Sequence, residues 1–137
     1  MQTTFEIATS GAGLYEFTQP VSRWLRGGDG ILTLMVMHTS ASLLIQENAD
    51  PEVQGDLQAF FSRLVPPSTD PAMSYLKHTY EGPDDMPAHI KAAMMPVTLT
   101  IPVQAGVMRL GTWQGLYVFE HRTAPHQRWI AAHFSAH

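Results

Sequence analysis

The middle of the chain, from Tyr75 to Met94, limits what the rest can fold into. Gly82 is followed by prolines at positions 83 and 87, and such a run cannot continue a helix or a central strand. We therefore expect a bent loop, followed by a helix from Ala88 to Met95 whose start is capped by Asp85. The same stretch holds two histidines and three acidic residues: His78, His89, Glu81, Asp84 and Asp85. The loop thus carries side chains of the kinds that bind metal ions.

Strand and short-helix patterns precede this loop. Residues 3–9 and 14–18 alternate between apolar and polar side chains, which predicts a hairpin or two paired strands. Residues 20–25 have helical spacing and are followed by glycines, which predicts a first short helix. Residues 31–39 are apolar on both faces, as expected of a strand buried on both sides, and residues 41–45 form the next strand.

The clearest helix pattern begins at Asp50. This residue is a good N-cap, Pro51 suits the first helical position, and the prolines at 66 and 67 end the segment. One apolar stripe runs along it: Val53, Leu57, Phe60, Phe61 and Leu64. We expect a helix that packs on a core through this stripe.

Strand patterns fill the last third of the chain, over residues 97–103, 107–110, 116–121 and 128–134. Pro102 marks the first of them as an edge strand or a strand end. Strands at both ends with helices in the middle predict an α+β fold, mainly an antiparallel sheet or β-sandwich with two to three helices. The length of 137 residues suits a single domain over residues 1–137.

Composition narrows the classes of function. With no cysteine, histidine and carboxylate are the only expected metal ligands. The net charge is −4, and the sequence has no cluster of lysines and arginines that could bind along the phosphates of a nucleic acid. Nucleic acid is therefore not an expected partner. No apolar run approaches the roughly 20 residues that cross a bilayer, and the first residues lack the pattern of a signal peptide. We therefore expect a cytoplasmic protein with no membrane partner.

Three histidines, His38, His78 and His89, form the main metal hypothesis. Three imidazoles suit zinc, and leave an open position for water or substrate. Taken singly, each histidine is more often a hydrogen-bonded core or surface residue, but His38 lies where an unpaired imidazole would be costly. Glu81 is the candidate general base, and the acids could also hold magnesium; the alternative is a solvated loop that only caps the helix.

A second group of residues could shape a pocket. In the segment from Gly111 to Gly115, Trp113 could stack on a ring while Gln114 binds it, or the tryptophan could simply be buried in a tight connection. Asn48 could likewise contact a ligand or only organise a turn. Ser40 and Ser42 lie near a histidine, but no nucleophile elbow surrounds them, which argues against a serine hydrolase.

Five ordered motifs together resemble one family. They are His38-Thr39-Ser40-Ala41-Ser42; Glu47-Asn48-Ala49-Asp50-Pro51; Tyr75-x-x-His78-x-x-Glu81-Gly82-x-x-Asp85-x-x-x-His89; Leu99-Thr100-Ile101-Pro102; and Leu110-Gly111-Thr112-Trp113-Gln114-Gly115. The chain resembles the YjbQ family, also called UPF0047 or secondary thiamine-phosphate synthases. The resemblance implies a β-sandwich that assembles as a homotrimer with sites near subunit boundaries. It also implies a metal, most readily zinc, held by His38, His78 and His89.

The resemblance assigns Glu81 to catalysis and five residues to substrate binding: Thr39, Ser40, Asn48, Trp113 and Gln114. The implied reaction joins a hydroxymethylpyrimidine diphosphate to a thiazole phosphate with release of pyrophosphate. Two alternatives stay open. One is metal-dependent hydrolysis of a small substrate with Glu81 as base, and the other is a trimeric protein that binds a metal or metabolite without catalysis.

Overall fold

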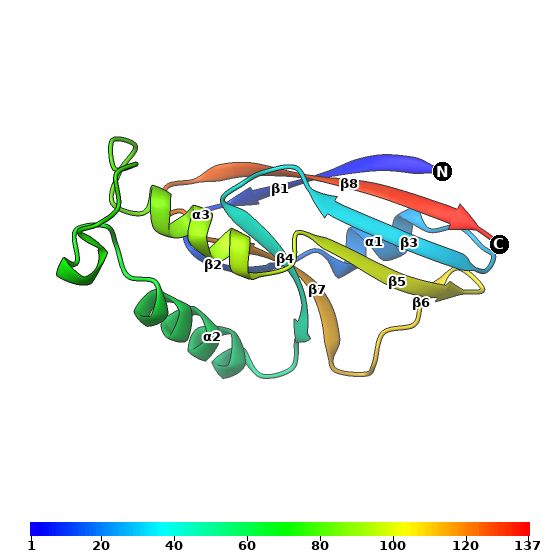
Figure 1. The fold of residues 1–137 in the computed structure, drawn as a ribbon. Helices are drawn as coiled ribbons and strands as arrows, with labels where there is room; N and C mark the ends of the chain where they lie inside the picture. Colours follow the sequence, from blue (N-terminus) through cyan, green and yellow to red (C-terminus); the bar gives the residue numbers. More distant parts are fainter.

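Two antiparallel β-sheets pack face to face in the computed structural model, which describes all residues 1–137 (Figure 1). The first sheet has the order β1 (Gln2–Thr9), β8 (His126–Ala136), β3 (Gly30–Val36), β5 (Thr98–Gln104) and β6 (Val107–Met108). The second has the order β2 (Gly13–Glu16), β7 (Gln114–Glu120) and β4 (Ala41–Glu47). The helices are α1 (Thr18–Trp24), α2 (Pro51–Leu64) and α3 (Asp85–Met94), with a 3₁₀ turn at η1 (Pro71–Met73). The predicted α+β sandwich is confirmed.

The core lies between the two sheets. Leu32, Leu34 and Val36 of β3 point inward and meet Leu116 and Val118 of β7 in one apolar cluster. All five are buried, and each stabilises the fold by roughly 1.5–3 kcal/mol relative to an exposed side chain. The alternating pattern of these strands therefore specifies which face meets the core.

Strand β7 is covered on both faces. Tyr117 and Phe119, which are buried but lie outside the core cluster between the sheets, contact side chains of α2. Gln54 Nε2 donates a 3.1 Å hydrogen bond to the Tyr117 hydroxyl, and Phe61 meets the Phe119 ring edge-on at 5.9 Å between centroids. The second sheet is thus the middle layer, between the first sheet and the helices.

The prediction that residues 31–39 are buried on both sides is wrong. Only the inward row of β3 is buried, whereas Ile31 is 51% exposed and Met35 is 44% exposed. The reason is that the first sheet is an outer layer, and nothing within the chain packs on its outward face. An apolar run alone does not distinguish this position from a middle layer.

The predicted pairing of the first two strands is also wrong. β1 pairs with β8 in the first sheet, and β2 pairs with β7 in the second. Gly11 and Gly13, both with positive φ, let the chain cross from one sheet to the other between these strands. A short glycine-containing connection here joins two layers and does not form a hairpin.

Helix α2 begins and ends where the sequence predicts, and Asp50 accepts a hydrogen bond from the Glu52 amide as its N-cap. Its apolar stripe is only partly covered, since Phe60 is 57% exposed and Leu64 is 51% exposed. Helix α3 begins at Asp85, three residues before the predicted start. Pro87 is tolerated in its first turn because N–H groups there have no intrahelical acceptor. No helix has the length and apolar character to cross a membrane.

His121 follows β7 and is buried in the layer beneath the helices. Its side chain is almost fully covered, and Nε2 lies 2.9 Å from the Ser42 hydroxyl. Burial lowers the pKa of His121 to about 3, and the nearby Lys91 charge contributes to the same shift. The folded protein therefore keeps this imidazole neutral in acid that protonates it in the unfolded chain.

Replacing His121 with leucine should make the protein less sensitive to acid. In the unfolded chain the His121 imidazole takes up a proton below its ordinary pKa of about 6.5, whereas in the native state it stays neutral down to about pH 3. The native state therefore loses stability relative to the unfolded chain as the pH falls from about 6.5 toward 3. Between pH 7 and 5 we expect His121 to account for about 2 kcal/mol of that loss. Urea unfolding at both pH values measures it. An equal loss in wild type and His121→Leu would contradict this account.

Candidate metal centre

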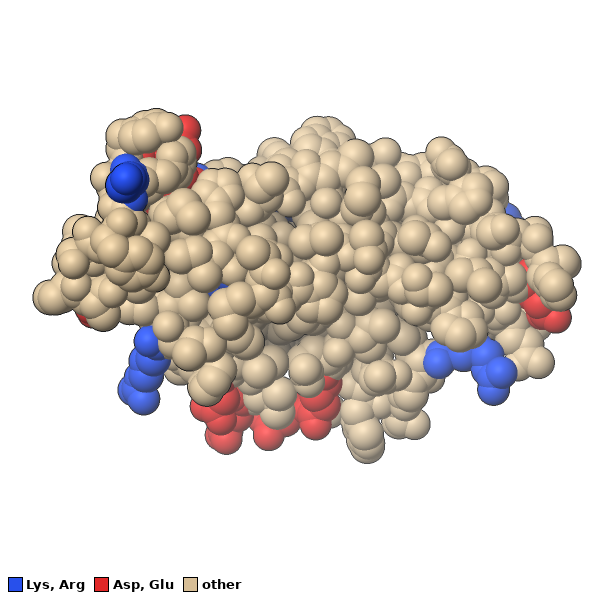
Figure 2. All heavy atoms as spheres, viewed as in Figure 1, with Lys and Arg blue, Asp and Glu red and all other residues tan.

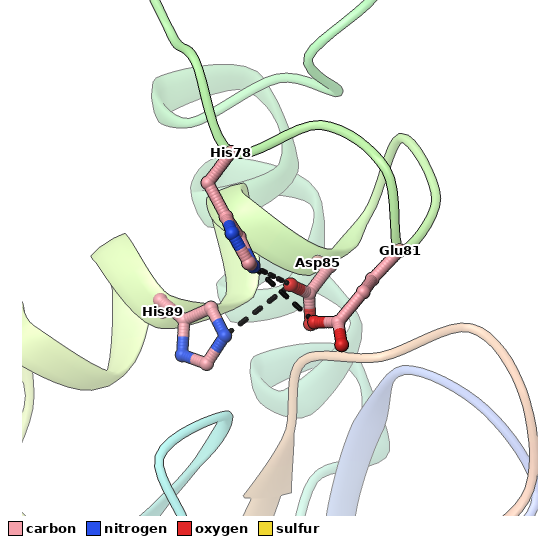
Figure 3. Close-up of side chains that lie close together, drawn as sticks. All are labelled: His78, Glu81, Asp85 and His89. Atoms are coloured by element: carbon pink, nitrogen blue, oxygen red, sulfur yellow. Dashed lines mark hydrogen bonds and ion pairs between the residues drawn. The ribbon is translucent and has the colours of Figure 1, made fainter.

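Four side chains converge where the acidic loop meets α3. His78 and Glu81 come from the loop, and Asp85 and His89 lie one turn apart on the helix (Figure 3). One potential ligand atom from each lies within 4.8 Å of the others. In a tetrahedral zinc site with bonds of about 2.1 Å, neighbouring ligand atoms are about 3.4 Å apart. The cluster therefore fits one divalent ion after small side-chain movements.

His89 is oriented by the backbone beyond β3. Its Nδ1 lies 2.9 Å from the Thr39 carbonyl, which can only accept, so Nδ1 carries a proton. Nε2 then points at the cluster, 3.3 Å from Asp85 Oδ2. In the neutral ring this nitrogen bears a lone pair, so two acceptors face each other unless a cation lies between them. A backbone carbonyl behind a ligating imidazole is the usual support for a metal-bound histidine.

Asp85 is the centre of the cluster. It is only 2% exposed, and its Oδ2 lies 2.8 Å from His78 Nε2, which also lies 3.2 Å from Glu81 Oε2. Burial pushes the pKa of Asp85 upward, but the hydrogen bond with His78 and the nearby Arg122 charge oppose it, and the pKa is held below its usual value. The carboxylate is therefore charged and faces two imidazoles.

Arg122 fixes the acidic loop from outside the cluster. Its Nη1 donates a 2.9 Å hydrogen bond to Asp85 Oδ1, and its Nε donates a 2.8 Å bond to Asp84 Oδ2. A third bond, of 3.1 Å, reaches the Glu81 carbonyl. Gly82 has φ of +107°, a conformation that lets the loop turn tightly above Asp84. The loop is thus held in place by contacts within the chain.

His38, the third predicted ligand, lies outside this cluster. Its Nε2 accepts a 2.8 Å hydrogen bond from the Trp129 amide, so that nitrogen is already used. Partial burial and the nearby Arg128 charge lower the pKa of His38, which favours the neutral ring that accepts this bond. The structure brings His78 and His89 together and supplies Asp85 and Glu81 beside them.

His38 and His89 do share the wall of an open groove. The groove has a volume of about 500 Å³ and is lined mainly by apolar side chains, with Met35, Met95 and Val97 among them. Thr39 lies on the same wall, between the two histidines. The predicted substrate-binding residue Thr39 is therefore next to the cluster, whereas Ser40 is buried and accepts a 2.9 Å hydrogen bond from Arg128.

The other predicted pocket residues lie at the far end of the second sheet. The side-chain amide of Asn48 donates to the Gln114 carbonyl at 3.5 Å, and the backbone N–H of Asn48 donates to the Trp113 carbonyl at 2.9 Å. Asn48 follows β4, and Trp113 and Gln114 lie beside it at the start of β7, whereas Thr39 precedes β4, so the length of β4, about 20 Å, separates the two groups. Trp113 is largely exposed. Within one chain Asn48, Trp113 and Gln114 do not join the cluster of His78, Glu81, Asp85 and His89.

Sequence reasoning left Asp85 between a helix cap and a metal ligand, and it did not predict the contacts of Arg122. Asp85 resembled a helix cap, yet no side chain caps α3, and this carboxylate turns to the histidines instead. The available signal was its spacing of four residues from His89, which places both on one helix face. Nothing local marks Arg122, which is 37 residues from its partner Asp85 in the sequence.

Comparison with known proteins identifies the family. A family model described as UPF0047 protein YjbQ-like matches residues 3–137. The Synechocystis protein UPF0047 sll1880 is 44% identical, covering 98% of this chain and 90% of its own length. YjbQ of Escherichia coli O157:H7 is 39% identical, covering 96% and 94%. The crystal structure of the conserved hypothetical protein TT1486 from Thermus thermophilus superposes with a TM-score of 0.84 at 30% identity, covering 97% and 99%. The chain therefore belongs to the YjbQ (UPF0047) family.

Proposed function

We propose that this protein binds one divalent metal ion with His78, His89 and Asp85, keeps Glu81 beside the ion as a general base, and acts there on a small substrate that carries an oxyanion. The observation that carries the proposal is the convergence of two imidazoles and two carboxylates, with one ligand atom each within 4.8 Å of the others. Two imidazoles favour zinc over magnesium, which prefers oxygen ligands. The ion would supply positive charge to a phosphate or diphosphate group of the substrate.

The apolar groove supports a substrate with a ring. Its volume of about 500 Å³ is within the range of small-molecule sites, and it opens directly beside His89. A flat heteroaromatic ring could lie against Met35 and Met95 while its charged group reaches the cluster. This arrangement supports the synthesis of thiamine phosphate from a pyrimidine diphosphate and a thiazole phosphate as the first reaction to test.

Hydrolysis is the second candidate, favoured by the state of the nearby cations. Arg122 already bonds three oxygens of the acidic loop, and Arg128 is buried against Glu120. Neither is free to bind a leaving diphosphate, which such a transfer normally requires. Glu81 is the most exposed member of the cluster, so its carboxylate could accept a proton from an attacking water.

We further propose that the chain assembles as the homotrimer that the family resemblance implies. The outward face of β3 exposes Ile31 and Met35, and the middle of the face shown in Figure 2 carries few charged side chains. Such a surface supports association. In a trimer, Trp113 and Gln114 of one protomer could approach the metal cluster of the next, which would reunite the predicted pocket.

The test uses untagged protein loaded with zinc, with its mass checked by light scattering for three chains. Transfer is followed as thiamine phosphate formed from the two substrates, and hydrolysis as phosphate released from the diphosphate alone.

Glu81→Gln should lower whichever reaction is observed at least 100-fold with metal still bound, whereas Glu52→Gln, at an exposed position, should not. Transfer supports the first candidate and hydrolysis the second. Bound metal without turnover of either substrate would contradict both and favour a binding protein.

A further inference from the structure

A second cavity, lined mainly by polar side chains, lies on the opposite side of α3 from the cluster of His78, Glu81, Asp85 and His89. It is enclosed by α2, α3 and the chain that follows β7, and its volume is about 120 Å³. That volume corresponds to about four water molecules, well below the roughly 300 Å³ of a site for a drug-sized molecule. The polar side chains around it are Lys91, His121, Ser62, Gln58, Thr123 and Asp84.

Lys91 is buried at this cavity without an ion pair. The residue is 8% exposed, and no hydrogen bond or salt bridge within the chain reaches its ammonium group. Its ammonium nitrogen keeps a little contact with solvent, but a cation that is mostly covered and has no acceptor within the chain is well placed to bind an anion. An acceptor in the cavity would compensate the lysine.

His121 offers the second unpartnered group. Its Nδ1 is buried and has no hydrogen-bond partner, although the opposite ring nitrogen lies 2.9 Å from the Ser42 hydroxyl. When the Ser42 hydroxyl donates to Nε2, Nδ1 carries the proton and is a covered donor in the cavity wall, which a small movement of the ring would bring within reach of a ligand. Ser62 adds a hydroxyl proton, because its oxygen already accepts from Gln58 Nε2 at 3.3 Å.

The one acid at the cavity is compensated elsewhere. Asp84 Oδ2 accepts 2.8 Å and 2.9 Å hydrogen bonds from Arg122 Nε and the Thr123 amide, so its charge is matched by the guanidinium. No carboxylate forms an ion pair with Lys91. The cavity is therefore rich in hydrogen-bond donors, and Lys91 is a cation there without an ion-pair partner.

We infer that this cavity is a binding site for a small oxyanion, either inorganic phosphate or the phosphoryl group of a larger ligand, held by Lys91, His121 and Ser62. The site is separate from the metal cluster, because Lys91 and His89 lie on different faces of α3. It does not depend on the proposed reaction. Water alone in the cavity is the competing account.

Calorimetric titration with inorganic phosphate tests the inference. Wild type should bind phosphate saturably, and Lys91→Met should weaken binding at least ten-fold, while the matched change at the exposed Lys77, Lys77→Met, should not alter it. His89→Ala should also retain the binding, which separates this site from phosphate on a bound metal. Methyl phosphate that binds as well as phosphate would indicate a phosphoryl group of a larger ligand, and binding of phosphate alone a free anion.

Nuclear magnetic resonance of protein with labelled histidines gives a test that needs no variant. Phosphate should shift the imidazole signal of His121 at concentrations that leave the signal of the exposed His133 unchanged.

Two controls support the titration of the Lys91 variants. Circular dichroism checks that Lys91→Met is folded, and Lys91→Arg, which keeps the charge, should retain more phosphate binding than Lys91→Met. No saturable binding by wild type at tens of millimolar phosphate, or equal binding by Lys91→Met, would overturn the inference and leave a water-filled cavity.

Discussion

Replacing Arg128 with methionine should lower the free energy of unfolding by about 3–5 kcal/mol, because it leaves the carboxylate of Glu120 buried without its cation. Arg128 bonds both oxygens of Glu120 between the two sheets, with Nε at 2.7 Å from Oε1. Thr9 adds a 2.6 Å hydrogen bond to Oε1. Burial raises the pKa of Glu120, but these hydrogen bonds outweigh it and hold the pKa below its ordinary value.

Urea unfolding of four proteins separates the buried charge from the loss of packing. Arg128→Met should be much less stable than wild type, and the double variant Arg128→Met/Glu120→Leu should recover part of the loss, since it removes both charges. Arg109→Met, on the exposed surface, serves as the control. A loss below about 1 kcal/mol in Arg128→Met would show that the pair is not a buried ion pair in solution.

Asp85→Asn should reduce the affinity for zinc at least 100-fold. The carboxylate is buried, faces both His78 and His89, and supplies the one negative charge that the cluster holds away from solvent. The amide keeps the shape of the side chain but removes that charge, so the loss reports on metal binding more than on packing.

Competition with a zinc-binding dye measures this affinity in wild type, Asp85→Asn and Glu6→Gln, an acid-to-amide change on the exposed surface of β1. The control should bind zinc as wild type does. If Asp85→Asn binds zinc within about three-fold of wild type, the carboxylate is not a ligand and the cluster is held together by hydrogen bonds alone.

The local signals in the sequence were reliable where a residue acts on its own neighbours. Asp50 and Pro51 begin α2 as predicted, and the alternating strands give the inward rows of the sandwich. Sequence patterns could not show that Ile31 faces outward, because an outer and a middle layer give the same apolar run. The layer is decided by what packs on it from distant parts of the chain.

The candidate site was predicted in part for the same reason. His78, Glu81 and His89 lie within one stretch, so their convergence follows from a single loop and helix. His38 is different, because its role depends on the pairing of distant strands, which brings the Trp129 amide to its Nε2. Asp85 was ambiguous because an acid at a helix start suits a cap and a ligand equally well.

The most direct test of the account is the metal content of untagged wild type, His89→Ala and His38→Ala, each confirmed as folded. We predict close to one zinc per chain in wild type, loss of the metal in His89→Ala and retention in His38→Ala, because His38 Nε2 is already bonded to the Trp129 amide. A wild type that neither carries nor takes up zinc would contradict the metal site. Equal loss in both variants would contradict the ligand set and restore a site built on three histidines.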